Sequence, residues 1–152
     1  ARDLRFVTTA MKIVPDLERI ADHAANVCER SIELSAEPPI KQLVDIPQMA
    51  RRAQEMVRGA LDAFIDRDPD AARAVIAMDD ELDGQMEHVF RVLLSYMMED
   101  PRTISRAIRL TFVAKCYERI GDQATNICEL VVYMSEGSVI KHHSPDDKPQ
   151  DE

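Results

Sequence analysis

Apolar residues recur at intervals of three and four along most of the chain, which places them on one face of an α-helix. Ile104, Ile108 and Phe112 show this spacing in the last third of the sequence. The same pattern predicts four helices, at about residues 2–35, 43–67, 69–99 and 101–136. Helices of this length with short links pack as antiparallel neighbours, so we expect an all-α antiparallel helical bundle.

Local signals mark the ends of these helices. Asp68 and Asp100 each precede a proline, which combines an N-cap acid with a residue suited to the first helical position. Gly137 fits a C-terminal cap, and residues 137–152 have the composition of a flexible tail. Pro15 lies inside the first expected helix and predicts either a kink or a later start.

Composition agrees with a helical protein and excludes several classes of partner. Hydrophobic residues make up 45% of the 152 residues and aromatic residues only 5%, which disfavours a sheet protein. The formal net charge of −9 would repel nucleic acid and anionic membrane surfaces. No apolar run approaches the ~20 residues of a spanning helix, so we expect a chain that is peripheral to a membrane at most. The odd count of three cysteines indicates reduced thiols and a cytoplasmic location.

A twelve-residue motif occurs twice, one hundred positions apart. Residues 18–29 and 118–129 are identical at eight of these twelve positions. The identities include every acid and the asparagine, namely Glu18, Asp22, Asn26 and Glu29 in the first copy and Glu118, Asp122, Asn126 and Glu129 in the second. Because a repeat decides the architecture, the duplicated unit is expected to be built around these polar groups.

The acids of the second copy are expected to meet two acids of the preceding helix. The polar residues of the motif form one narrow stripe on their helix. Asp79 lies 21 residues before the turn at Asp100, and Asp122 lies 22 residues after it. Asp83 and Glu118 lie 17 before and 18 after, so an antiparallel hairpin brings the two pairs to the same height. Four converging carboxylates are costly unless cations neutralise them.

This arrangement predicts a site for hard metal ions. Carboxylate oxygens suit ferric iron, manganese, magnesium or calcium, whereas zinc usually takes His or Cys and is less expected. Asn126 and Glu129 continue the stripe, so they are candidate ligands for a further ion. The first copy supplies only half of such a site, because no acidic helix precedes it in the sequence. The alternative is a solvated acidic face, paired with basic neighbours such as Arg19 and Arg119.

The chain resembles the PhoU family of phosphate-transport and phosphate-regulon regulators at Glu118-Arg-Ile-Gly-Asp-Gln-Ala-Thr-Asn-Ile-Cys-Glu129 and its upstream Asp-x-x-x-Asp. In that family two three-helix repeats form an antiparallel bundle, and E(D)xxxD motifs hold metal clusters. The resemblance implies that 1–36 is the final helix of a first, truncated repeat, that 43–136 is a complete repeat and that 137–152 is a tail. It implies metal ligation by the residues Asp79, Asp83, Glu118, Asp122, Asn126 and Glu129, with Glu18, Asp22, Asn26 and Glu29 matching the other motif.

The resemblance also implies regulation rather than catalysis. Members of the family damp phosphate-starvation signalling and link the ATPase subunit of the phosphate ABC transporter to a sensor histidine kinase. We therefore expect these two partners, a homodimer, a cytoplasmic location and no enzymatic activity. We also expect the chain to start inside the first repeat. The helix 2–35 then needs a partner for its apolar face, either a second copy or the three-helix set 43–136.

Two other function classes start from the same residues. A carboxylate-bridged di-metal helical-bundle enzyme would need Glu-x-x-His on facing helices, but Ala21 and Gly121 stand where the histidines would be. A phosphotransfer bundle would need an exposed histidine, for which His23 and His88 are the candidates. The second copy of the repeat has Gln123 in place of His23, so the repeat does not require an imidazole.

Overall fold

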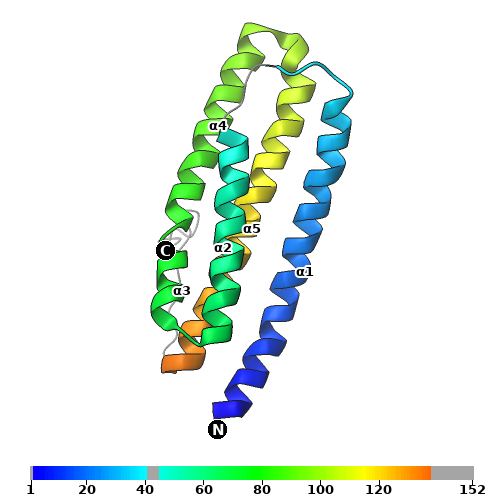
Figure 1. Ribbon diagram of the computed structural model, residues 1–152. Coiled ribbons are helices and arrows are strands. Elements are labelled where there is room, and N and C mark those ends of the chain that lie inside the picture. Colours follow the sequence, from blue (N-terminus) through cyan, green and yellow to red (C-terminus); the bar gives the residue numbers. More distant parts are fainter. Residues whose placement is uncertain (1, 41–44, 138–152) are drawn as a thin grey trace, which may run out of the picture.

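The structure is a computed structural model that describes residues 2–40 and 45–137. It contains five α-helices within these ranges, α1 (Arg2–Ser35), α2 (Asp45–Asp66), α3 (Pro69–Ile76), α4 (Asp79–Glu99) and α5 (Ile104–Glu136). A short 3-10 helix, Pro101–Thr103, connects α4 to α5. All regular structure in the described ranges is helical, which confirms the all-α prediction (Figure 1). The remainder of the expected tail, 138–152, lies outside the described residues.

The central helix is α5, because each of the other four α-helices packs against it. Figure 1 shows α4 and α5 as an antiparallel hairpin, with α1 running along α5 in the opposite direction. The buried residues of α5 extend from Ala107 to Met134, almost its full length. On α2 the buried side chains are small or flexible, Met49, Ala53, Met56, Ala60 and Ala63. Alanine permits close helix approach and methionine fills irregular gaps, so an aromatic-poor chain still forms a tight core.

The caps predicted from the sequence are present. The carboxylate of Asp68 accepts hydrogen bonds from two backbone N–H groups of α3, at 2.9 and 3.0 Å. Asp100 accepts one at 3.0 Å at the start of the 3-10 helix. Gly137 ends α5 with a left-handed φ of 72°. The helix α1 runs through Pro15 without interruption, so the later start considered for it was wrong.

The single helix predicted over 69–99 is divided at Ala77 and Met78. The N–H of Met78 donates to the carbonyl of Val75 at 3.0 Å, a 3-10-type bond that interrupts the α-helical ladder. No proline or glycine marks the break, so helix-breaking residues did not reveal it. Because of this break, Asp79 and the two acids after it occupy the first turn of α4, where the helix dipole favours negative charge.

The helix α1 packs on α5 through residues spaced by four and three. These buried or half-buried positions are Thr9, Ile13, Asp16, Ile20, His23 and Val27. Of the two partners expected for α1, the structure therefore provides the three-helix set of the same chain. Among the described helices none combines the length and apolar character needed to cross a membrane.

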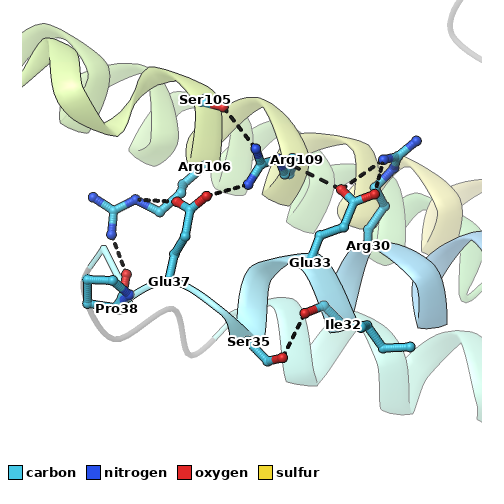
Figure 2. A network of polar contacts seen from close by, with 9 residues as sticks. All are labelled: Arg30, Ile32, Glu33, Ser35, Glu37, Pro38, Ser105, Arg106 and Arg109. Carbon is cyan, nitrogen blue, oxygen red and sulfur yellow. Dashed lines mark hydrogen bonds and ion pairs between the residues drawn. The ribbon is translucent and has the colours of Figure 1, made fainter.

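Alternating charges connect the end of α1 to the start of α5 (Figure 2). Arg30 donates to Glu33 at 2.7 Å, and Glu33 lies 3.8 Å from Arg109. Arg109 in turn donates to Glu37 at 2.7 Å, and Glu37 lies 3.4 Å from Arg106. Single exposed ion pairs contribute little, typically ~0–1 kcal/mol, but carboxylates shared between two arginines form a network. This network holds the segment after α1 against the helix that carries the second motif.

Candidate metal centre

Three carboxylates from two helices converge between α4 and α5. One side-chain oxygen of each of Asp79, Asp83 and Asp122 lies within 4.8 Å of the other two. Asp79 and Asp83 are one turn apart on α4, and Asp122 faces them from α5. Asp79 is only 4% exposed, and the other two are half-buried. The antiparallel hairpin therefore brings acids from both sides of the turn to the same height.

Gly121 lets the two helices approach at this point. A Cβ atom on residue 121 would lie 2.5 Å from Cδ2 of Leu82 and 3.4 Å from Oδ1 of Asp79. The missing side chain therefore allows α4 to carry Asp79 against α5. The packing function of Gly121 was not predicted from the sequence. The difference between the two copies of the motif could have indicated this function. Gly121 in the second copy is Ala21 in the first, and Ala21 is exposed on α1.

The electrostatic environment of the three carboxylates favours the binding of a cation. Burial raises the pKa of Asp83 to about 6, and the negative charges of Glu118 and Asp122 add to this rise. A smaller contribution comes from Asp80, while the Lys115 ammonium opposes the rise. A carboxyl group held near this pKa is partly protonated in mildly acidic solution. A bound cation would stabilise its ionised form.

Glu118 lies at the edge of the three-carboxylate group. Its charge acts on Asp83, but its own carboxylate forms an ion pair with Lys115, one turn earlier on α5. Lys115 thus acts as a tethered cation beside the acids. The sequence reasoning missed it, although its position three residues before Glu118 could have indicated the pair. The first copy has Pro15 at the equivalent position, so this neutralising group belongs to the second copy alone.

The other polar residues of the second motif are Asn126, which contacts α1, and Glu129, which does not join the three-carboxylate group. The side-chain amide of Asn126 hydrogen-bonds to Asp16 on α1, and this bond opposes the rise in the Asp16 pKa caused by burial. Glu129 is half-buried, and its charge adds to the effect of burial that raises the pKa of Cys128 to about 12. Both residues remain predicted ligands of a further ion.

The first motif presents its acids to solvent. Glu18, Asp22 and Glu29 are exposed on α1, and Asn26 is half-buried. Across residues 2–40 and 45–137, none of these three acids joins a group of three ligating acid, histidine or cysteine side chains. Their function as ligands stays a prediction.

The two histidines considered for phosphotransfer are also outside the acid group. His23 is half-buried on α1, and burial and the nearby Arg119 lower its pKa. His88 is exposed on α4 and lies 3.5 Å from a carboxylate oxygen of Asp45 on α2. Neither imidazole therefore contributes to the chemistry of the three carboxylates.

The donor set fits a hard cation. Oxygen ligands bind Ca²⁺ at about 2.3–2.6 Å, so two ligands on opposite sides of one ion lie about 5 Å apart. The 4.8 Å limit of the three-carboxylate group is compatible with one shared ion. The group offers neither the thiolate nor the imidazole that zinc prefers. Asp79, Asp83 and Asp122 would hold the ion, and Glu118 could join them after leaving Lys115.

Comparison with known proteins identifies the relatives of this chain. The family model described as PhoU domain matches residues 1–31 and 46–131. The "Phosphate-specific transport system accessory protein PhoU homolog" of Aquifex aeolicus is 45% identical over 93% of this chain and 64% of its own length. The protein of the same name from Zymomonas mobilis is 47% identical over 90% of this chain and 58% of its own length. The chain therefore spans about three fifths of these relatives.

Solved structures show the same architecture. A crystal structure of PhoU from Pseudomonas aeruginosa is 42% identical, with a TM-score of 0.86 over 91% of this chain and 66% of that one. The phosphate transport system regulatory protein PhoU from Streptococcus pneumoniae is 24% identical, has a TM-score of 0.83 and supports the fold alone. The family model covers well over half of the sequence, and the chain therefore belongs to the PhoU family.

Proposed function

We propose that this chain acts in the regulation of phosphate uptake and phosphate-starvation signalling, and that Asp79, Asp83 and Asp122 bind a hard metal ion in that function. Iron, manganese and magnesium are the first candidates for the ion, and zinc is a weaker one. The regulatory half rests on membership of the PhoU family and on the names of the relatives.

One observation carries the metal half of the proposal. Three carboxylate oxygens lie within 4.8 Å of one another in a chain of net charge −9. Such crowding is unfavourable because like charges at short range disfavour ionisation. An ion that binds all three turns this repulsion into binding energy, as in other oxygen-ligand sites.

The proposed mode of action is binding rather than catalysis. A hard cation takes about six or more ligands, so three or four carboxylates leave coordination positions open for water or for a phosphate oxygen. This provides a physical link between phosphate and the regulator. The proposed protein partners are the ATPase subunit of the phosphate transporter and a sensor histidine kinase, with a homodimer as the active form.

Metal binding is tested by titrating the purified, EDTA-treated protein with Mn²⁺, Mg²⁺, iron and Zn²⁺ in a calorimeter. We expect at least one of the first three to bind, and inorganic phosphate to tighten that binding. The variant Asp83→Asn should lose binding, while Asp62→Asn, an exposed acid on α2, should keep it. Equal binding by the two variants, or no binding by the wild type, would reject the metal half of the proposal.

The regulatory half has a separate test. The chain is mixed with the purified ATPase subunit and with the cytoplasmic part of the kinase, with and without the bound ion. We expect a complex with at least one of them. Failure to bind either protein would reject the proposed partners and leave the metal site intact.

A further inference from the structure

A row of large apolar side chains stands exposed on the α4–α5 hairpin. Phe90, Leu94 and Met98 come from α4, and Ile104, Ile108 and Phe112 come from α5; these six form what we call the apolar strip. Every one of them is at least 41% exposed. Contiguous apolar surface of this kind marks interaction sites more often than scattered single residues do.

The two helices present these residues on the side that carries the acids. On α5, Ile104 and Ile108 lie 18 and 14 residues before Asp122, within about 40° of it around the helix axis. On α4, Phe90 follows Asp79 by 11 residues, about 20° around the axis. Leu94 and Met98 lie about 60° and 100° from Asp79, and Phe112 about 80° from Asp122, so the apolar strip runs from the turn of the hairpin along the edge of the face that carries the acids.

The apolar strip is only partly shared with the first copy of the repeat, where Leu4 is equivalent to Ile104 and is 69% exposed. In the first copy of the repeat, Thr8 and Lys12 stand where the second copy has Ile108 and Phe112. Both of these first-copy residues are exposed as well, so the difference is one of chemistry and not of burial. The two copies therefore differ at two of the three α5 positions of the apolar strip, while α1 has exposed apolar residues of its own at Val7 and Met11.

The charge beside the apolar strip is negative. Asp83, Glu87, Glu118 and Asp122 lie on the same faces of α4 and α5 together with two bases, Lys115, which is paired with Glu118, and the exposed Arg119. At the other edge Arg30 stacks 5.4 Å above the ring of Phe112 but is bonded to Glu33. An approaching partner therefore meets apolar surface followed by a region with more acids than bases.

We propose that the apolar strip docks an amphipathic helix of a partner protein, with lysine or arginine further along that helix beside the carboxylates. Apolar anchors at i, i+4 and i+7 span about 10 Å of helix, close to the roughly 12 Å covered by Ile104, Ile108 and Phe112 at i, i+4 and i+8 on α5. Basic residues at i+14 and i+18 then fall about 21–27 Å along, at the height of Glu118 and Asp122. Complementary charge sets the direction and register of the docked helix.

This inference goes beyond the proposed metal function and does not depend on it. The basic residues of the docked helix would interact with the carboxylates directly, without a metal ion. The experiment is therefore run in EDTA. Failure of metal binding and failure of helix docking give separate results.

The test uses fluorescence anisotropy with labelled helical peptides of about 22 residues. The first peptide carries leucine at i, i+4 and i+7 and lysine at i+14 and i+18, and the second has glutamate in place of both lysines. We expect the lysine peptide to bind the wild-type protein at least tenfold more tightly, with a preference that falls as salt rises.

Variants locate the binding surface. Ile108→Asp should weaken the lysine peptide at least tenfold, and Ile108→Gln serves the same purpose with a smaller perturbation. Ile32→Asp, at an exposed apolar residue on α1, should leave binding unchanged. Glu118→Gln with Asp83→Asn should reduce the lysine preference while leaving the glutamate peptide unaffected or bound more tightly.

Three results would overturn the proposal. The first is equal affinity of the two peptides, or equal loss in the Ile32 and Ile108 variants. The second is a concentration-dependent dimer, seen by sedimentation, that Ile108→Asp abolishes, because a second copy then covers the apolar strip. The third is binding to phosphatidylcholine vesicles that the same substitution abolishes, because lipid is then the occupant.

Discussion

The two copies of the twelve-residue motif share their acids but differ in what faces them. On α5, Asp122 meets Asp79 and Asp83 from the neighbouring helix. On α1, the equivalent Asp22 is exposed to solvent. The same residues at the same spacing thus give a candidate ion site in one place and a solvated stripe in the other. The motif supplies half of the ligands, and the opposite helix decides whether a site exists.

The largest expected difference between the copies is in metal affinity. Replacing a residue that hydrogen-bonds to a metal ligand costs about 10–100-fold in affinity, so loss of a direct ligand should cost at least as much. Asp122→Asn is therefore expected to weaken Mn²⁺ binding on the order of 100-fold. Asp22→Asn should change it less than twofold, as measured by calorimetry. Similar losses in both variants would show that the two copies are not distinct.

The next contrast concerns packing. Gly121→Ala places a methyl group against Leu82 and Asp79, and overpacking of this kind costs about 1–3 kcal/mol. Part of this cost is offset by the better helix propensity of alanine, ~1 kcal/mol. We expect a net loss in the free energy of unfolding of about 1 kcal/mol, measured with urea, and weaker Mn²⁺ binding.

The reciprocal change supplies the control. Ala21→Gly, at an exposed position, should destabilise by about 0.5–1 kcal/mol through propensity alone and leave Mn²⁺ binding intact. Unchanged binding in Gly121→Ala would contradict the function given to Gly121.

A third contrast is the pH dependence of the metal-free protein. The folded-state pKa of Asp83 is raised from 3.8 to about 6, so the folded state holds the proton more tightly than the unfolded state. Between pH 4 and 6 this carboxyl group therefore makes stability fall as pH rises. Asp83→Asn should remove that component and raise the melting temperature at pH 7.5 but not at pH 4.

Because Asp83 is half-buried, solvent screening limits the expected gain to about 1 kcal/mol or less. Thermal melts in EDTA at the two pH values measure it, with Asp22→Asn as the matched variant on α1. A larger gain at pH 4 than at pH 7.5 would have the wrong sign for this account.

The smallest expected effect comes from Lys115, which the first copy replaces with Pro15. Lys115→Ala removes a positive charge beside the three carboxylates and frees Glu118. At a separation of about 5 Å in a high dielectric, the repulsion of a divalent ion by this charge is ~1–2 kcal/mol before screening by salt. We expect Mn²⁺ to bind several-fold more tightly to the variant, and Lys12→Ala on α1 to have no effect.

The helical class and the convergence of acids at the hairpin could be predicted from the sequence. The first follows from the spacing of apolar residues, and the second from the number of residues between each acid and the turn. Asp68, Asp100 and Gly137 marked helix ends by local chemistry, and the near-equal distances from Asp100 placed Asp79 opposite Asp122. Counting could not show that the amide of Asn126 turns to Asp16, because that depends on where α1 packs. Nor could it show the break before Asp79, which arises from backbone bonding without a helix-breaking residue.

The contacts that hold α1 on the bundle differ between its two ends. At the amino-terminal end, Phe6 stacks on Phe64 of α2 at a centroid distance of 5.0 Å, a contact insensitive to salt. At the other end shared arginine–carboxylate pairs, which mobile ions weaken, add to the apolar packing of Val27 and Leu34. High salt should therefore loosen only the carboxy-terminal end of α1. Amide hydrogen exchange would show this as faster exchange that begins near Glu33 and does not extend to Phe6.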